Sequence, residues 1–250
     1  ADAANVMVTV KGGSINAAQD AFLLGDSCAS CALTVTGASF SGGLMNGHAV
    51  EITAKATGSR VVFQNDDVRG DTSVLDATAT LSVSGSTFKE NGTEAESMIN
   101  FAGQAIDVTD SSITLMTDNF GINLGGGTLT TSGLTIQGGN YGIYQLSGNT
   151  KLRGTKISGY VFMGLYLAQG SLDLGTAMDP GGDAFATGTT GPLVFGLYVD
   201  GVTKPVTSSN TTFNGVEPPA GTLAAPATDP ISVPGEYFIN DGTTMSFWTL

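Results

Sequence analysis

The chain has 250 residues, 36 of them glycine, which is about twice the usual share of roughly 7%, while charged residues make up only 12%. The net charge is -13, so nucleic acid and acidic membrane surfaces would be repelled and are excluded as main partners. Hydrophobic residues reach 41%, so the low charge indicates a chain with a large core and not a disordered one.

The N-terminal region carries two signs of export. The sequence begins Ala1-Asp2-Ala3, small residues of the kind that remain after a signal peptide is removed, so we expect a mature protein that is secreted or held at the cell surface. The two cysteines, Cys28 and Cys31, are close in sequence, and in an exported chain we expect a local disulfide between them. No run of about 18 apolar residues is present, and we expect no membrane span.

An eight-residue motif that starts at Val8 recurs along the chain. Residues 8–15 align with residues 33–40, with apolar residues at the first and third positions, Gly, Asn or Asp at the fifth, and Ile, Phe or Val at the eighth. Successive copies start 20 to 28 residues apart as far as Thr150, which is the length of one coil of a solenoid. The further copies start at Val61, Leu81, Ile106, Leu129, Thr150 and Val206.

Each position of the motif has a structural cause. Apolar residues that alternate with Thr, Ser or Asp predict a strand with one buried face. Gly, Asn and Asp accept the left-handed backbone conformation at low cost, so we expect a sharp bend after each strand. The apolar eighth position then returns to the core and begins a second short strand.

A second motif supplies a third strand to each coil. It occurs as Gly121–Leu124, Gly142–Tyr144, Gly164–Leu167 and Gly196–Val199. Three short strands per coil predict an all-β fold, a right-handed single-stranded parallel β-helix of about eight or nine coils. We expect the coils over residues 1–213 and a Pro-rich tail with capping strands over 214–250. An antiparallel barrel is the alternative, but it would need two-residue hairpin turns.

From residue 171 onward, several segments resemble a known family. They are Asp173-Leu174-Gly175-Thr176, Pro180-Gly181-Gly182-Asp183-Ala184-Phe185, Asn210-Thr211-Thr212-Phe213-Asn214 and the closing stretch 235–242. These are similar to the late coils of an uncharacterised bacterial domain-of-unknown-function family of right-handed parallel β-helix surface proteins, with the pectate-lyase-like superfold. The resemblance implies that fold and an envelope or secreted location. It implies no activity, because the family has no assigned catalytic residues.

Charged residues raise the question of an enzyme, because β-helices also carry polysaccharide lyases and hydrolases. Asp66, Asp67 and Asp71 are weak candidates for a Ca²⁺ site, and Arg69 and Lys89 share one repeat position, so they should stack. The alternative is that these charges are scattered over the loops and serve solubility. We therefore expect no catalytic residues and no cofactor, with Ca²⁺ left open.

The single histidine, His48, follows Gly47 in an expected loop and is interpreted as a solvent-facing residue. One histidine argues against a zinc site with four protein ligands and against a Ser-His-Asp triad.

Three tyrosines occupy equivalent positions in the second motif. Tyr144, Tyr166 and Tyr198 each follow an inward Ile or Leu, so they should point outward and stack on consecutive coils, with Tyr141 and Tyr160 in adjoining loops. A tyrosine row can hold sugar rings by their apolar faces, which makes these residues candidates for glycan binding. The alternative is that the row only stabilises the stack of coils.

Together these features predict an exported, non-catalytic β-helix protein of the bacterial surface that acts as a structural, adhesive or filament-forming subunit. Its expected partners are further copies, in end-to-end contact, or other surface proteins. The alternative function is that of a polysaccharide-binding or polysaccharide-degrading, lyase-like β-helix protein, with polysaccharide as the partner.

Overall fold

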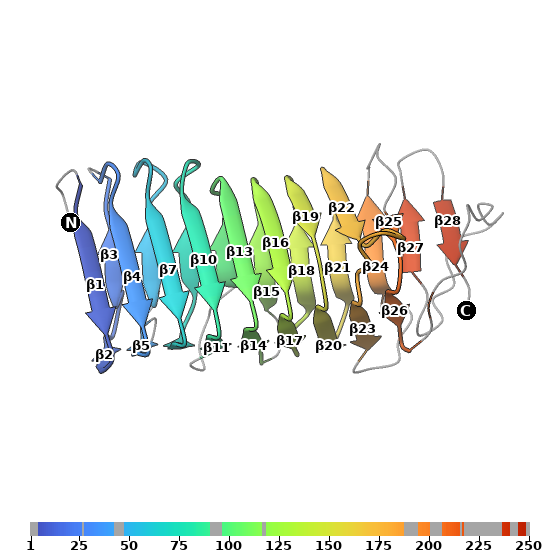
Figure 1. Ribbon diagram of the computed structural model, residues 1–250, viewed down its shortest axis with the longest axis horizontal. Coiled ribbons are helices and arrows are strands. Elements are labelled where there is room, and N and C mark those ends of the chain that lie inside the picture. Colours follow the sequence, from blue (N-terminus) through green and yellow to red (C-terminus); the bar gives the residue numbers. More distant parts are fainter. Residues whose placement is uncertain are drawn as a thin grey trace.

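The computed structural model describes residues 5–26, 28–42, 48–90, 97–116, 119–187, 195–200, 207–215, 217, 237–240 and 245–248. These residues form a parallel β-solenoid, as the repeat predicts, with the strands stacked along one long rod from β1 at one end to β28 at the other (Figure 1). The described part of the chain contains no helix, and hence none that could cross a membrane.

Three sheets run along the rod, and in each, apart from the final pair β27 and β28, the neighbouring strands come from successive coils. Sheet A consists of β1 (Met7–Lys11), β4 (Ala32–Thr36), β7 (Arg60–Gln64), β10 (Thr80–Ser84), β13 (Ala105–Thr109), β16 (Thr128–Ser132), β19 (Asn149–Lys151), β22 (Ser171–Leu174) and β25 (Thr207–Ser208). Sheet B consists of β2 (Ser14–Asn16), β5 (Ser39–Ser41), β8 (Asp67–Arg69), β11 (Thr87–Lys89), β14 (Ser112–Thr114), β17 (Thr135–Gln137), β20 (Lys156–Tyr160), β23 (Ala184–Thr187) and β26 (Thr212–Phe213). Sheet C consists of β3 (Phe22–Leu24), β6 (Val50–Ile52), β9 (Thr72–Val74), β12 (Ser97–Phe101), β15 (Phe120–Leu124), β18 (Tyr141–Gln145), β21 (Met163–Leu167), β24 (Phe195–Asp200), β27 (Tyr237–Asn240) and β28 (Met245–Trp248).

The core lies inside the coil and is built from columns of equivalent residues. Val61 pairs in parallel register with Leu33 on one side and Leu81 on the other, and all three are fully buried. Rings stack in the same way, since Phe63 packs edge-to-face against both Phe40 and Phe88. Burial of each such side chain stabilises the fold by about 1.5–3 kcal/mol. A shift of one residue in the pairing would expose these side chains, so the apolar positions of the repeat set the register of the coils.

The bend after each strand of sheet A uses the left-handed conformation, which confirms the prediction for the fifth motif position. At Gly133 the φ angle is 66°, and an added Cβ would lie 2.5 Å from Oδ1 of Asp110 on the neighbouring coil. Both the backbone angle and the close neighbour therefore favour glycine there. A positive φ occurs at the fifth position of all eight motif copies, namely Gly12, Gly37, Asn65, Gly85, Asp110, Gly133, Gly154 and Asn210.

The residue after this bend links the coils by side-chain hydrogen bonds. The Ala38 backbone N–H donates to Asp66 Oδ1 at 2.8 Å, and the Asp66 N–H in turn donates to Ser86 Oγ at 3.1 Å. The Ser86 N–H donates to Ser111 Oγ at 3.1 Å. Further along the same column the Thr155 N–H donates to Asp183 Oδ1 at 2.8 Å. These short polar side chains satisfy backbone groups that the bend removes from the sheet hydrogen bonding.

One coil departs from the motif that the sequence shows. Strand β22 pairs with β19, and β23 pairs with β20, so the two strands form a coil in register with the one before it. Between them, residues 175–181 form an extra loop, and Gly182, with φ 65°, takes the bend position. The insertion separates the third and fifth motif positions, which explains why the repeat at Leu172 is not visible as an octad.

The C-terminal segment contributes two described strands. Strand β27 pairs in parallel with β24 and extends sheet C, and β28 pairs antiparallel with β27. The other residues of the Pro-rich tail, apart from Asn214, Gly215 and Glu217, lie outside the described part of the chain.

Candidate functional site

The outer face of sheet C carries a row of stacked tyrosines. Tyr144 on β18, Tyr166 on β21 and Tyr198 on β24 are register partners on three successive coils. The ring centroids are 4.6 Å apart for Tyr144 and Tyr166 and 5.6 Å apart for Tyr166 and Tyr198, and both pairs are inclined by 12°. The three rings are therefore nearly parallel and stack as the repeat predicts, whereas their binding of sugar stays a prediction.

Further aromatic residues widen this row into a face, which we call the aromatic face. Phe120 stacks on Tyr141 at 5.0 Å, and Tyr141 packs edge-on against Tyr144 at 5.2 Å. Phe162 lies 6.0 Å from Tyr141, is 39% exposed, and gives the face an accessible edge. We define the aromatic face by Phe120, Tyr141, Tyr144, Phe162, Tyr166, Phe195 and Tyr198.

The two tyrosines expected in adjoining loops differ in their positions. Tyr141 begins β18 and joins the aromatic face, where partial burial raises the pKa of its hydroxyl. Tyr160 ends β20 and is fully buried, so it belongs to the core, and burial raises its pKa as well. The phenylalanines of the face were not predicted, because the motif fixes only the tyrosine position.

Polar side chains continue the tyrosine column toward the N-terminal coils. Asn123 on β15 pairs in register with Tyr144 and, on its other side, with Asn100 on β12. The amide of Asn123 donates to Asn100 Oδ1 at 3.3 Å. The same column reaches Ser73 on β9 and Glu51 on β6. The column thus runs through seven successive coils, with polar side chains followed by aromatic rings, and within it Ser73 is buried.

The three aspartates predicted for Ca²⁺ have separate partners. Buried Asp66 accepts hydrogen bonds from the backbone N–H groups of Ala38 and Gln64, at 2.8 and 2.6 Å, and burial raises its pKa. Asp67 pairs with Arg69 at 3.2 Å. Asp71 contacts His48. The structure does not bring the three carboxylates together. It does pair Arg69 with Lys89 in register, as their shared repeat position predicts.

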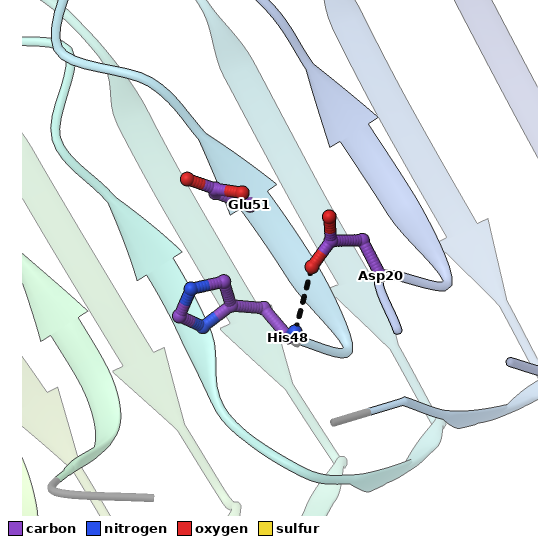
Figure 2. Close-up of side chains that lie close together, drawn as sticks. All are labelled: Asp20, His48 and Glu51. Carbon is purple, nitrogen blue, oxygen red and sulfur yellow. Dashed lines mark hydrogen bonds between the residues drawn. The ribbon is translucent and has the colours of Figure 1, made fainter. Parts of the chain in front are cut away.

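A cluster around His48 was not predicted. His48 lies just before β6, and its imidazole Nδ1 contacts Asp71, so the side chain is only 32% exposed and the interpretation as a solvent-facing residue is wrong. The hydrogen bond with Asp71 raises the pKa of His48, and the charges of Glu51 and Asp20 act in the same direction. Figure 2 shows Asp20 and Glu51 beside the ring, with the His48 backbone N–H donating to Asp20 Oδ1 at 2.8 Å.

A second charged cluster holds the extra loop between β22 and β23. Arg153 contacts Asp173 at 2.9 Å and Asp179 at 2.7 Å, and Lys151 contacts Asp179 at 2.8 Å. These cations hold the pKa of Asp179 well below its usual range. Fully buried Asp183 follows the loop, and burial raises its pKa to about 7. This cluster closes an insertion and is mutually neutralised, which indicates a structural role.

Cys28 and Cys31 are joined by a disulfide with a Cα–Cα distance of 5.9 Å. Both residues are buried, at the turn that precedes β4. The bridge therefore lies inside an early coil.

Comparison of the chain with family models, curated proteins and solved structures gives no match. The fold and the local geometry define the protein as a parallel β-solenoid with an aromatic face on sheet C and a histidine–carboxylate cluster near its first coils.

Proposed function

We propose that the protein is an exported, non-catalytic adhesion protein of the cell surface that binds polysaccharide on the aromatic face of sheet C. The observation that carries this proposal is the stack of Tyr144, Tyr166 and Tyr198. Because the three rings stack on one another, they cover one another's faces and turn their edges outward. A row of such edges offers apolar carbon atoms along a sugar chain, and each tyrosine also offers a hydroxyl for hydrogen bonding.

The polar part of the same column supports a linear ligand. Ser73 of this column is buried, so the accessible run extends from Asn100 to Tyr198, five positions at the strand spacing of about 4.8 Å, which gives a length of about 19 Å. A glycan chain laid along the rod would meet the amides of Asn100 and Asn123 and then the rings. The net charge of -13 favours a neutral polysaccharide over one rich in uronates.

Two further features support export and a surface location. Disulfides form and persist mainly in oxidising compartments, so the bridge between Cys28 and Cys31 supports export. The resemblance of segments 173–176, 180–185 and 210–214 to bacterial surface proteins with a right-handed, pectate-lyase-like β-helix points the same way.

The test separates glycan binding from packing of the rings. A glycan array probed with the full chain should identify a neutral polysaccharide, and calorimetry with its oligosaccharide should give the affinity. We expect Tyr166→Ala to weaken binding at least tenfold, and Tyr166→Phe, which keeps the ring, to retain most of it. Gln137→Ala, on the exposed outer face of sheet B, is the matched control.

Thermal unfolding of the same variants gives the second readout. If the row only stabilises the coils, Tyr166→Ala lowers the melting temperature while no glycan binds either protein, and the proposal fails. If binding is lost in Tyr166→Ala at a temperature where the variant remains folded, the row is a binding surface.

A second candidate function is assembly into filaments by end-to-end contact. The described residues leave Val8, Val10 and Ile15 of the first coil only half-buried against the core, whereas the equivalent Leu33, Val35 and Phe40 of the next coil are fully buried. Head-to-tail contact would continue the solenoid and cover these side chains. Negative-stain electron microscopy over a concentration and Ca²⁺ series tests this function: long uniform fibres support it, and isolated short rods at every condition refute it.

A further inference from the structure

The first coils of sheet C bring three residues with metal-binding side chains to one place. Asp20 precedes β3, His48 precedes β6, and Glu51 lies on β6. One ligand atom from each lies within 4.8 Å of the other two, and all three residues are half-buried. Figure 2 shows the three side chains close together. We propose that Asp20, His48 and Glu51 bind a divalent first-row transition ion of the Zn²⁺ type.

The contacts of His48 fix the orientation of the imidazole. Nδ1 is engaged by the carboxylate of Asp71, which follows β8 and precedes β9. Metal-binding histidines commonly use one ring nitrogen for the ion while the other donates to a carboxylate that fixes the ring and its tautomer. Asp71 supplies this arrangement and leaves Nε2 to bind the ion. Asp71 is thus a positioning residue, whereas Asp20, His48 and Glu51 are the ligands.

Asp20 is also held in place without an ion. Its Oδ1 accepts the backbone N–H of His48 at 2.8 Å, a contact between residues 28 positions apart in sequence. This bond ties the carboxylate to the same segment that carries the imidazole. Two of the three ligands are therefore positioned by the coil itself, which lowers the entropic cost of binding an ion.

The charge of the cluster also favours a cation. Three carboxylates, those of Asp20, Glu51 and Asp71, surround one imidazole, and no lysine or arginine of the described residues forms an ion pair with them. Neighbouring carboxylates repel one another, and a bound dication would neutralise two of these negative charges.

The ligand types select the class of ion. One imidazole nitrogen with two carboxylates suits Zn²⁺, Co²⁺ or a neighbouring ion, whereas Ca²⁺ prefers oxygen ligands alone. Three protein ligands leave a position for water, as in open zinc sites. A single histidine disfavours only a closed zinc site with four protein ligands, whereas this cluster is of the open type.

The single histidine of the chain permits a direct test on the wild-type protein. The imidazole protons of His48 give one set of signals in a proton NMR spectrum. We expect Zn²⁺ added alone to the full chain to shift these signals and to saturate at one ion per chain, and Co²⁺ to produce visible absorption bands of a low-symmetry site. Ca²⁺ at the same concentration should leave the signals in place. Unchanged His48 signals under Zn²⁺ would overturn the proposal.

Variants then identify the ligands. Calorimetry should show Zn²⁺ affinity reduced at least tenfold in His48→Gln and in Glu51→Gln, and by about 10-fold in Asp71→Asn through loss of the fixed ring orientation. Asp107→Asn, which removes an exposed carboxylate on β13, is matched in charge and should bind like wild type. Retained affinity in His48→Gln, or an equal loss in Asp107→Asn, would mean diffuse attraction of cations to an acidic surface and would refute the site. Thermal unfolding without metal verifies that each variant is folded.

Discussion

Replacement of Asp183 by asparagine should change how the stability of the protein depends on pH. Asp183 is 1% exposed, and burial raises its pKa from 3.8 to about 7, with the Thr155 N–H and the charge of Arg153 acting against the shift. The folded state therefore holds the proton more tightly than the unfolded chain does. The contribution of this group to stability is full below pH 4, is lost as pH rises toward 7, and stays lost above it.

The size of the effect follows from the pKa difference. About three pKa units at 1.36 kcal/mol each correspond to a loss of about 4 kcal/mol between pH 4 and pH 8. The asparagine side chain carries no charge at either pH, so the variant lacks this loss. We expect Asp183→Asn and wild type to have similar free energies of unfolding at pH 4, and the variant to be more stable at pH 8 by up to about 4 kcal/mol.

Urea denaturation followed by far-ultraviolet circular dichroism between pH 4 and pH 8 measures this difference. Other carboxylates with shifted pKa values, such as Asp66 and Asp76, are common to both proteins and cancel in the comparison. Asp183→Ser is a second variant, because it places in this column the hydroxyl that Ser86 and Ser111 use to accept a backbone N–H. Parallel stability curves for wild type and both variants would refute the assignment of a buried, proton-holding carboxyl at Asp183.

Three further predictions concern the bend, the extra loop and the disulfide. Gly133→Ala combines a left-handed φ with a Cβ 2.5 Å from Asp110, and should cost about 1–3 kcal/mol in urea denaturation, more than Gly154→Ala, where the nearest atom is 3.7 Å away. Arg153→Ala removes both ion pairs that hold Asp173 and Asp179, so limited proteolysis should cut within residues 175–181 faster than in wild type, and an unchanged rate would contradict the structural role of this cluster. Replacing Cys28 and Cys31 together by Ala opens a very short loop and should lower stability by about 2 kcal/mol, and a reductant should then have no further effect on the melting temperature.

The fold was predictable because a solenoid repeats the same physical problem in every coil. The alternation of apolar residues in Leu81-Ser82-Val83 specifies a strand with one buried face, and the glycine two residues later specifies the bend. The spacing of these features within the motif is the same in every copy, and this sets the register of the coils. Leu81 accordingly lies opposite Val61 and Ile106, as the alignment of the motif requires. The local motif thus predicts both the strands and the pairing between coils, which is why the fold could be predicted from a single sequence.

The prediction failed where an insertion breaks the period. Leu172 and Leu174 on β22 and Phe185 on β23 occupy normal core positions, but six extra residues stand between the two strands in comparison with the preceding coil. A search for the motif requires a fixed spacing between its apolar positions. The coil itself forms as long as β22 can pair with β19 and β23 can pair with β20. The signal that remained was Gly182-Asp183-Ala184-Phe185, a bend glycine followed three residues later by a core aromatic residue.

The residues of the candidate sites were harder to find because they lie in columns across coils and not in motifs along the chain. Asp20 and His48 are 28 residues apart, and no spacing rule connects them. The pairing of Phe22 with Val50 does connect them, because each residue stands two positions before one member of that pair. Once β3 and β6 are aligned, the two side chains must be neighbours at the strand spacing of about 4.8 Å. The same operation extends the tyrosine row through Asn123 and Asn100. In a β-solenoid, sites are therefore predicted by aligning coils first and then searching each column for residues that could share one ligand.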